Sequence, residues 1–596
     1  MSGLLNQPMK QTIKLQYKMK RVKLITGILL LAAVAFWSTS CKKPASRTTG
    51  WEYNNPANGG YQVQRFIEQE TGPGLVLIEG GTFLMGRTNQ EVTENWDNIP
   101  RRVTVNSFYM DQTEVANVDY LEYLYWISRI YGIDFPRIYE KALPDTLVWR
   151  KKLAFNEPYA ELYLRHPAYQ DYPVVGVNWL QARDYCAWRT DRVNEQILIN
   201  EGVLKRDPMQ QNEENFNTRS YLAGQFVGLV DKELKDLNPN SSGTRGVRME
   251  DGILLPSYRL PTEAEWEFAA LGLIGNTYYE RIVERRIYPW NGHNTRTDSR
   301  KYYGEFVANF VRGRGDMMGV AGHLNDKAAI TAPVFAYWPN DYGLYNMAGN
   351  VAEWVADVYR PLSFEDFEEF NPFRGNIFST VVLNNEGTYD DKLDYITYDY
   401  KGVLDYLVNF QSELANSGTA SDKEADLVEA VIADAEKAVE DNDARNTEDA
   451  SQRIQDAIDK INNADETIKI GGALLKGIAN YVQGMPGQIK TREVRPEENI
   501  GRRNYRQADN VDFKDGDVMS MVSADFFVKL DEDRDMYHYG ETSLINNRTR
   551  VYKGGSWRDR EYWISPGTRR FLEENQATEY IGFRCAMHRV GDPRGN

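Results

Sequence analysis

Short apolar blocks separated by glycines and polar turns predict several β-strands. Leu75–Ile78 is an uninterrupted apolar run, followed by the turn residues Glu79-Gly80-Gly81 and by a second block at 82–86. Further along, Val103 and Val105 alternate with polar residues ahead of another apolar triplet. Runs bounded by turn signals and period-two alternation are both typical of strands. The region after residue 72 is therefore predicted to begin with strands.

Apolar residues at three- and four-residue spacing predict helices between these strands. Thr113 is placed to cap a helix through Ile127, and Asn178 is placed to begin another that turns Cys186 toward the core. Thr262-Glu263-Ala264-Glu265 has the capping-box pattern, in which a hydroxyl and a carboxylate satisfy free backbone amides at a helix start. A third helix is therefore expected from 263 to Gly272.

The segment 421–465 predicts an acidic hairpin of two amphipathic helices. Ser421 and Glu424 form a capping box, and 441–446 supplies the turn. Two interpretations are open: the hairpin packs on its own domain, or its apolar seam docks another protein. The apolar stripes consist of Leu427, Val431, Ala435 and Val439 in the first helix and Ile454, Ala457, Ile458 and Ile461 in the second.

The N-terminal residues have the pattern of a bacterial lipoprotein signal. Basic residues precede a short apolar stretch, 24–37, and small residues then lead to Cys41. The stretch is shorter than a membrane span, although a transmembrane anchor is the alternative interpretation. We expect 1–40 to comprise an upstream extension and a signal peptide, with Cys41 as the lipidated residue. No acidic run follows Cys41, which favours the outer membrane and a protein that faces the periplasm.

The charge balance limits the partners. The chain has a formal net charge of -16, and residues 1–40 carry six basic and no acidic residues, so removing them gives -16 - 6 = -22. This balance disfavours nucleic acid and anionic lipid surfaces as partners of the whole protein. There are five histidines, and no two are spaced i, i+4, so a zinc or non-haem iron site is not expected.

Besides Cys41, the sequence contains two cysteines, Cys186 and Cys585. An even pair in an oxidising compartment suggests one long-range disulfide, and two buried free thiols are the alternative.

Eight motifs in a fixed order carry a resemblance to the formylglycine-generating enzyme (FGE) or sulfatase-modifying factor family. The most diagnostic is Arg259–Glu267, and each of the others is weak alone. The resemblance implies an irregular α+β fold, distantly like that of C-type lectins. The other motifs are 78–86, 113–115, 173–179, 288–290, 342–354, 554–557 and 582–585.

The resemblance also implies a domain organisation. An N-terminal tether spans 41–71, the FGE-sulfatase-like domain spans 72–590, and a tail follows at 591–596. Large insertions interrupt the domain at 131–171, 192–257 and 361–550, and the last of these contains the helical hairpin.

Two structural calcium sites and one disulfide are implied by the family. The disulfide joins Cys186 of a Tyr-Cys-x-Trp helix to Cys585 of a Gly-Phe-Arg-Cys strand. Side-chain and carbonyl oxygens suit calcium, although such residues also cap turns. The first calcium site corresponds to Asn346, Gly349, Val351 and Glu353, and the second corresponds to Asn309, Phe310, Asp326 and Ala328.

The two catalytic cysteines of the family correspond to Asp559 and Ile564 in this chain. Neither side chain forms a thiolate or binds copper(I), because that chemistry requires sulfur. The resemblance therefore implies an inactive member of the family.

Two functions follow from these expectations. The lipobox, the segment 47–51, the segment 68–74 and the insertions resemble the GldJ/GldK group of gliding-motility lipoproteins of Bacteroidetes. That resemblance implies a structural role in type IX secretion and gliding, with ring proteins of the GldK and GldN type as partners. The alternative is a periplasmic protein that binds a peptide or glycan in the former substrate groove.

Overall fold

The computed structural model describes residues 44–87, 98–272, 286–311, 328–359, 373, 375, 379–384, 387, 389–417, 421–444, 446–464, 469–494 and 548–591. The chain divides into two compact units. The smaller unit contains the residues up to Arg65 together with Glu233–Gly246. In it, β5 (Leu234–Lys235) pairs with β6 (Thr244–Arg245), and a short 3-10 turn, η1, spans Pro56–Asn58.

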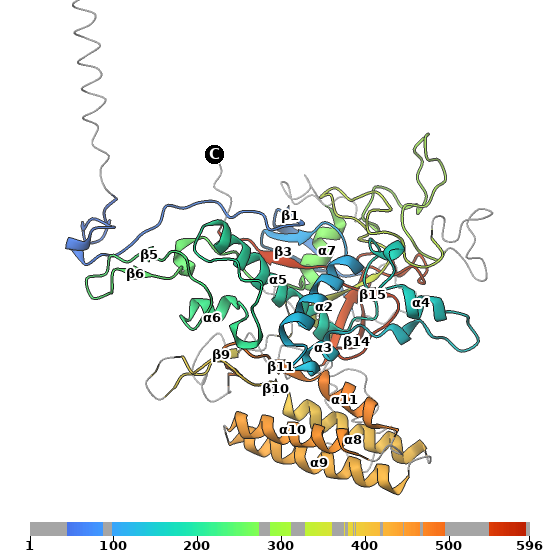
Figure 1. The fold of residues 1–596 in the computed structure, drawn as a ribbon. Helices are drawn as coiled ribbons and strands as arrows, with labels where there is room; N and C mark the ends of the chain where they lie inside the picture. Colours follow the sequence, from blue (N-terminus) through green and yellow to red (C-terminus); the bar gives the residue numbers. More distant parts are fainter. Residues whose placement is uncertain are drawn as a thin grey trace, which may run out of the picture. The chain divides into compact units, whose positions relative to one another are not determined.

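Two four-stranded sheets organise the larger unit (Figure 1). Their strand orders are β1-β4-β16-β7 and β14-β13-β8-β15, and the β15–β8 pair is parallel while the other pairs are antiparallel. The C-terminal strands β15 and β16 therefore join separate sheets. The bounds are β1 Leu75–Ile78, β4 Phe108–Asp111, β7 Tyr258–Arg259, β8 Ala352–Val358, β13 Thr549–Lys553, β14 Arg570–Glu573, β15 Ile581–Gly582 and β16 Ala586–His588.

Three two-stranded ladders complete the strands of this unit, and β2–β3 confirms the strands expected after the Gly80-Gly81 turn. The ladders are β2 (Gly81–Met85) with β3 (Arg101–Val105), β9 (Ser379–Val381) with β12 (Thr491–Glu493), and β10 (Thr397–Tyr398) with β11 (Val482–Gly484).

Helices with apolar faces pack against these sheets and ladders. The predicted capping box is present at Thr262, and Asn178, which was predicted only to begin a helix, forms another with Gln181. The helices are α2 Asn117–Tyr131, α3 Pro136–Ala142, α4 Glu157–Leu162, α5 Trp179–Asn200, α6 Thr218–Leu222 and α7 Glu263–Leu271, with 3-10 turns η2 Thr146–Trp149, η3 Pro167–Tyr169, η4 Asn212–Glu214 and η5 Met249–Asp251.

The helix expected directly after Thr113 begins later, and that part of the prediction is wrong. Residue Ala116 pairs with Pro173 in an isolated β-bridge, and α2 begins only at Asn117. Its buried face includes tyrosines as well as aliphatic residues, for example Tyr120 and Tyr123. The aliphatic spacing put Val118 on the same predicted face as Leu124 and Ile127, but Val118 is 46% exposed whereas the other two are buried.

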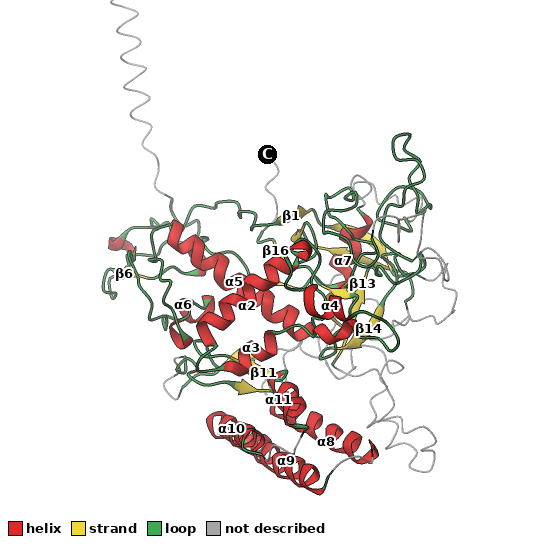
Figure 2. Cartoon of the chain, turned by 45° about the vertical axis from the view of Figure 1, so that its right-hand side comes forward, coloured by secondary structure: helices red, strands yellow, loops and turns green. Residues whose placement is uncertain are grey.

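The predicted hairpin is present as part of a larger helical bundle (Figure 2). Helix α9 spans Asp422–Asp443 with Ser421 and Glu424 as its capping box, and α10 spans Thr447–Asn462. Figure 2 shows α8 (Tyr400–Ser417) beside them, and α11 (Gly471–Ala479) follows. The apolar seam is buried inside this bundle, which agrees with packing on the domain itself rather than docking through the seam.

The described residues thus form a mixed α+β fold, as the sequence predicted. In the part of the chain that the structure covers, no helix combines the length and apolar character needed to cross a membrane.

Candidate functional site

The positions that the family resemblance matched to catalytic cysteines lie after β13, beyond a turn of two glycines. Gly554 has φ +91°, and a Cβ there would lie 2.9 Å from the Trp266 ring, so a side chain is sterically excluded. The turn brings Ser556 to Asp559, and the Ser556 hydroxyl donates to Oδ2 at 2.6 Å. Arg570 donates to both carboxylate oxygens of Asp559, at 2.8 and 2.6 Å. Asp559 is therefore held in a bidentate ion pair.

Ile564 is fully buried in an apolar cluster. The cluster surrounds it with aromatic rings, which include those of Tyr288, Phe306 and Phe310. At the position that the family resemblance assigned to a catalytic thiol, the chain therefore has a packing residue, and an aliphatic side chain supplies no nucleophile or metal ligand.

Part of the predicted insertion 131–171 packs onto this motif. Trp149, which ends η2, is 3% exposed and stacks on Trp557 with 6.1 Å between ring centroids. Glu579, almost fully buried, accepts from Arg558 at 2.6 Å and pairs with Lys151. Aromatic stacking and two ion-pair contacts thus tie the insertion to the Gly554–Arg558 run.

The first predicted calcium loop is occupied by protein contacts. Glu353, on β8, is fully buried and accepts from Arg584 Nε and Nη2, both at 2.6 Å, and from the Trp266 indole at 2.8 Å. Asn346 donates to Glu114, a residue that the sequence analysis did not assign to the site, at 3.0 Å. A cation at this loop would share Glu353 with the Arg584 guanidinium, so the residues as arranged do not fit one.

Glu114 is the least expected of these groups, because it is a carboxyl buried beside a second carboxyl. The pKa of Glu114 is raised from 4.5 to about 8, mainly by burial; the Arg584 guanidinium lowers it and the nearby Glu353 carboxylate raises it. Besides Asn346, its partner is the Asn350 side-chain amide, at 2.9 Å. The Thr113-Glu114-Val115 motif was the one sequence signal that marked this position.

The second predicted calcium site fits a cation better. Asn309 is fully buried, and its amide nitrogen donates to the Ile330 carbonyl at 2.8 Å, while no described residue donates to its side-chain oxygen Oδ1. A buried acceptor without a donor is unfavourable unless an ion or a water satisfies it. Of the other predicted ligands, Phe310 and Ala328 are among the described residues, whereas Asp326 lies outside them.

The structure brings the two predicted sites together. A Cβ on Gly349, which has φ +76°, would lie 2.4 Å from the Asn309 carbonyl oxygen, so only glycine allows this approach. The backbone amide of Asn350 donates to the same Asn309 carbonyl at 2.9 Å. Val351, the remaining predicted carbonyl ligand, is fully buried directly before β8.

Cys186 on α5 and Cys585, just before β16, face each other in the core. Their Sγ atoms are 3.3 Å apart, which is a contact between two thiols and longer than an S–S bond of about 2.05 Å. Burial raises the pKa of the Cys585 thiol. The residue pairing was expected, and the covalent bond stays a prediction. Cys41, the predicted lipidation residue, lies outside the described residues.

We expect oxidation to link these two cysteines, because their sulfur atoms need to approach by little more than 1 Å. Peptide mapping of the protein without reductant should find a peptide pair joined through Cys186 and Cys585. The Cys186→Ser variant provides the control that removes the linked pair. Complete alkylation of both thiols in the unfolded, unreduced protein would contradict the disulfide.

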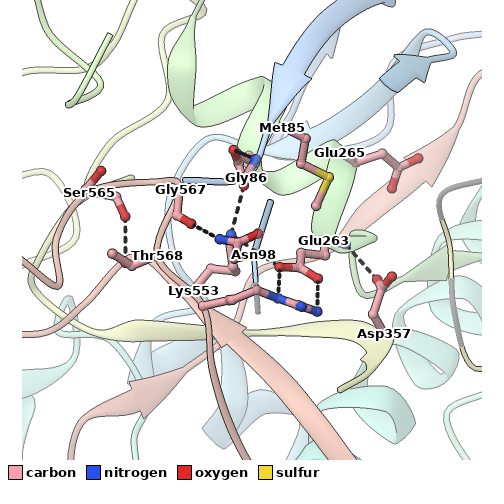
Figure 3. Close-up of polar contacts among 12 residues, drawn as sticks. Met85, Gly86, Asn98, Glu263, Glu265, Asp357, Lys553, Ser565, Gly567 and Thr568 are labelled. Carbon is pink, nitrogen blue, oxygen red and sulfur yellow. Dashed lines mark hydrogen bonds and ion pairs between the residues drawn. The ribbon is translucent and has the colours of Figure 1, made fainter. Parts of the chain in front are cut away.

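A second buried cluster of charges involves Lys553, the residue directly before the two-glycine turn (Figure 3). Lys553 donates to Glu267 at 2.9 Å and to Glu263 at 3.4 Å, and all three side chains are almost inaccessible. Arg569 pairs with both oxygens of Glu263, at 2.8 and 2.9 Å. Figure 3 also shows the Glu263 amide donating to Asp357. Sequence reasoning placed Glu263 only in a capping box and missed these partners.

Comparison with known proteins finds that this chain is similar to formylglycine-generating enzymes and to an inactive homologue of them. Mouse formylglycine-generating enzyme is 26% identical over 340 residues, which cover 52% of this chain and 68% of the mouse protein. The bovine enzyme is 24% identical over 48% of this chain and 57% of its own length. Bovine "Inactive C-alpha-formylglycine-generating enzyme 2" is 25% identical over 48% of this chain and 71% of its own length.

The structure titled "Structure of PvdO from Pseudomonas aeruginosa" has a TM-score of 0.32 and 13% identity, covering 86% of this chain and 93% of its own, and we draw no argument from that similarity. The family "Sulfatase-modifying factor enzyme 1-like domain" (FGE-sulfatase) matches residues 62–394, more than half of the 596 residues, and this match ends before the Gly554-Gly555 turn. The chain therefore belongs to the FGE-sulfatase family, which contains active enzymes and inactive homologues.

Proposed function

We propose that this protein is a catalytically inactive member of the family that serves as a structural component of the type IX secretion and gliding machinery. One observation carries the inactive assignment, and the resemblance of the lipobox and the insertions motivates the role in secretion and gliding. At the positions of the two catalytic cysteines, Ile564 is buried in an apolar cluster and Asp559 is held by Arg570. The fold at this site supports packing and supplies no thiol for cysteine oxidation.

We propose that lipidation of Cys41 anchors the protein at the periplasmic side of the outer membrane. Ring proteins of the GldK and GldN type are the proposed partners. The test is affinity isolation of the tagged protein from solubilised outer membranes, followed by identification of co-isolated proteins. Absence of every ring component would reject the structural role. Conversion of a cysteine in a substrate peptide to formylglycine by the purified protein would reject the inactive assignment.

Replacement of the lipidated residue gives a direct prediction. Cys41→Ala should move the protein from the membrane fraction to the soluble fraction, because the acyl chains that hold it there are lost. The measurement is fractionation by ultracentrifugation, with Cys186→Ala as the matched control that should stay with the membranes. Sedimentation of Cys41→Ala with the membranes would contradict lipid anchoring.

We further propose that a structural calcium ion binds at Asn309, with the Phe310 and Ala328 carbonyls and the Asp326 carboxylate as the other ligands. Removal of calcium with a chelator should lower the Tm, because an ion that binds only the folded state stabilises it. In Asn309→Ala the Tm should no longer respond to the chelator. Asn294→Ala is the control, and an equal Tm of the wild-type protein with and without calcium would contradict the bound ion.

A small pocket is the place to test the alternative function, the binding of a peptide or glycan. It lies beside the Asn346 loop and is lined by aromatic residues that include Trp290, Tyr337 and Trp338, of which Trp338 is 44% exposed. Aromatic faces of this kind pack against sugar rings and peptide side chains. A peptide or glycan array would detect such binding, and signals no higher than background would exclude it.

A further inference from the structure

The loop Arg150–Phe155, within the predicted insertion 131–171, presents two apolar side chains to solvent. Leu153 is 101% exposed and Phe155 is 88% exposed, so neither side chain packs on the protein. Two more exposed leucines, Leu147 and Leu162, precede and follow the loop, at 50% and 44% exposure. Exposed apolar side chains grouped in one loop and its flanks are a sign of an interaction site.

The loop is braced at its base. Its neighbour Trp149 is buried, and the Trp149 carbonyl accepts from the Asn156 side-chain amide at 3.1 Å. The Ala154 amide donates to the Lys151 carbonyl at 3.1 Å and closes a turn at the tip. Arg150 Nε donates to Glu157 at 2.9 Å. These contacts fix the direction of the tip, which keeps its apolar side chains from folding back onto the protein.

The backbone at the tip is strained. Leu153 has φ +67°, in the left-handed region that L-residues other than glycine and asparagine adopt rarely. The other described non-glycine residues with positive φ are all asparagines. Leu153 thus combines an unfavourable backbone conformation with an apolar side chain exposed to water. Both features are unfavourable in free energy, and both occur at the same residue. Such outliers concentrate at functional contacts.

The charges beside the tip are opposite in sign to those of the protein. Arg150, Lys151 and Lys152 are consecutive cations in a chain whose formal net charge is -16. Lys151 and Arg150 are tethered to Glu579 and Glu157, and Lys152 is exposed next to Leu153. Aliphatic and aromatic side chains with adjacent cations are the combination that enters the boundary between acyl chains and headgroups.

We propose that the Arg150–Phe155 loop is a membrane-contact element, which places Leu153 and Phe155 in the interfacial region of a phospholipid bilayer. The inference rests on the proposed function, because the lipid on Cys41 would keep the chain at a membrane. A bilayer fits a convex apolar tip without a shaped pocket, and its anionic headgroups match the local cations. Since the protein as a whole is acidic, the contact is confined to this tip.

The test uses the full, acylated chain in vesicles of three parts phosphatidylethanolamine to one part phosphatidylglycerol. A fluorophore on Ala154→Cys reports on the tip, since Ala154 is exposed between Leu153 and Phe155, and Cys186 and Cys585 are buried. Lipids with a nitroxide on the acyl chain should quench this probe. The quenching should fall to the level of an Ile133→Cys probe, whose position is 83% exposed, when Leu153 and Phe155 are both replaced by aspartate.

The outcomes separate the two proposals. An unquenched probe at 154 on protein that remains bound to the vesicles overturns the membrane contact and leaves lipid anchoring intact. Equal quenching in the double aspartate variant, or equal quenching at 133, also overturns it. Release of the protein from the vesicles counts against anchoring itself. A probe at 154 that resists lipid quenching but crosslinks to a protein in native membranes assigns the tip to protein docking instead.

Discussion

Glu263→Gln is expected to destabilise the protein by about 3–5 kcal/mol, the usual cost when one partner is removed from a buried ion pair. Glu263 is 2% exposed and bonds Arg569 through both oxygens, and it also contacts Lys553. Glutamine keeps the shape but not the charge. Arg569 would then be left buried with a neutral partner, and Lys553 would retain only Glu267.

The same substitution should change the dependence of stability on pH. Burial alone would raise the pKa of Glu263, but Arg569 and Lys553 outweigh it and lower the pKa from 4.5 to about 2. A carboxyl whose pKa is lower in the folded state contributes stability above its unfolded pKa. This contribution is present above about pH 4.5 and is lost as the pH falls toward 2. The wild-type protein and the variant should therefore converge in stability over that interval.

Guanidinium chloride unfolding at pH 7 and at several lower pH values measures both effects. The matched control is Glu157→Gln, which removes a carboxylate from an ion pair with Arg150 on the surface. Exposed pairs contribute little, so this control should leave the unfolding midpoint nearly unchanged. Equal midpoints for the wild-type protein and Glu263→Gln at pH 7 would show that the buried cluster is not stabilising.

Arg584→Met should also destabilise the protein by about 3–5 kcal/mol, because it leaves the buried Glu353 carboxylate without its cationic partner. Arg584 is fully buried and pairs with both oxygens of Glu353. It also donates to the carbonyls of Asp111, at 3.2 Å, and Tyr345, at 2.9 Å. Methionine fills much of the volume but donates to none of these oxygens.

The Arg584 variant also tests what neutralises the Glu353 carboxylate. If the Arg584 guanidinium is the cation that neutralises Glu353, Arg584→Met should lower the Tm sharply. Millimolar calcium should then recover part of the lost Tm by binding the Glu353 carboxylate in place of the guanidinium. Arg558→Met is the control, since Arg558 is 42% exposed and its partner Glu579 also pairs with Lys151. A Tm of Arg584→Met equal to that of the control would contradict the assigned role.

Local patterns in the sequence were sufficient for much of the fold. The capping boxes at Ser421 and Thr262 and the strand at Leu75–Ile78 were predicted because each depends on residues within a few positions of one another. Helix α8 was missed, although Val403 and Leu407 repeat at helical spacing and are both buried against the hairpin. Attention to that spacing would have predicted a bundle rather than a hairpin.

The sequence by itself determined the family motifs and the absence of thiols at 559 and 564, and it predicted that Cys186 and Cys585 lie together. The tertiary structure alone decided which charges meet. Lys553 joins Glu263 across 290 positions, and Arg584 joins Glu353 across 231. Such pairs leave no periodic signal, because their geometry depends on how β13 and the C-terminal strands cross the rest of the chain. Likewise, the exposure of Leu153 follows from where its loop is braced, since an apolar residue in a sequence gives no indication of which side of the surface it occupies.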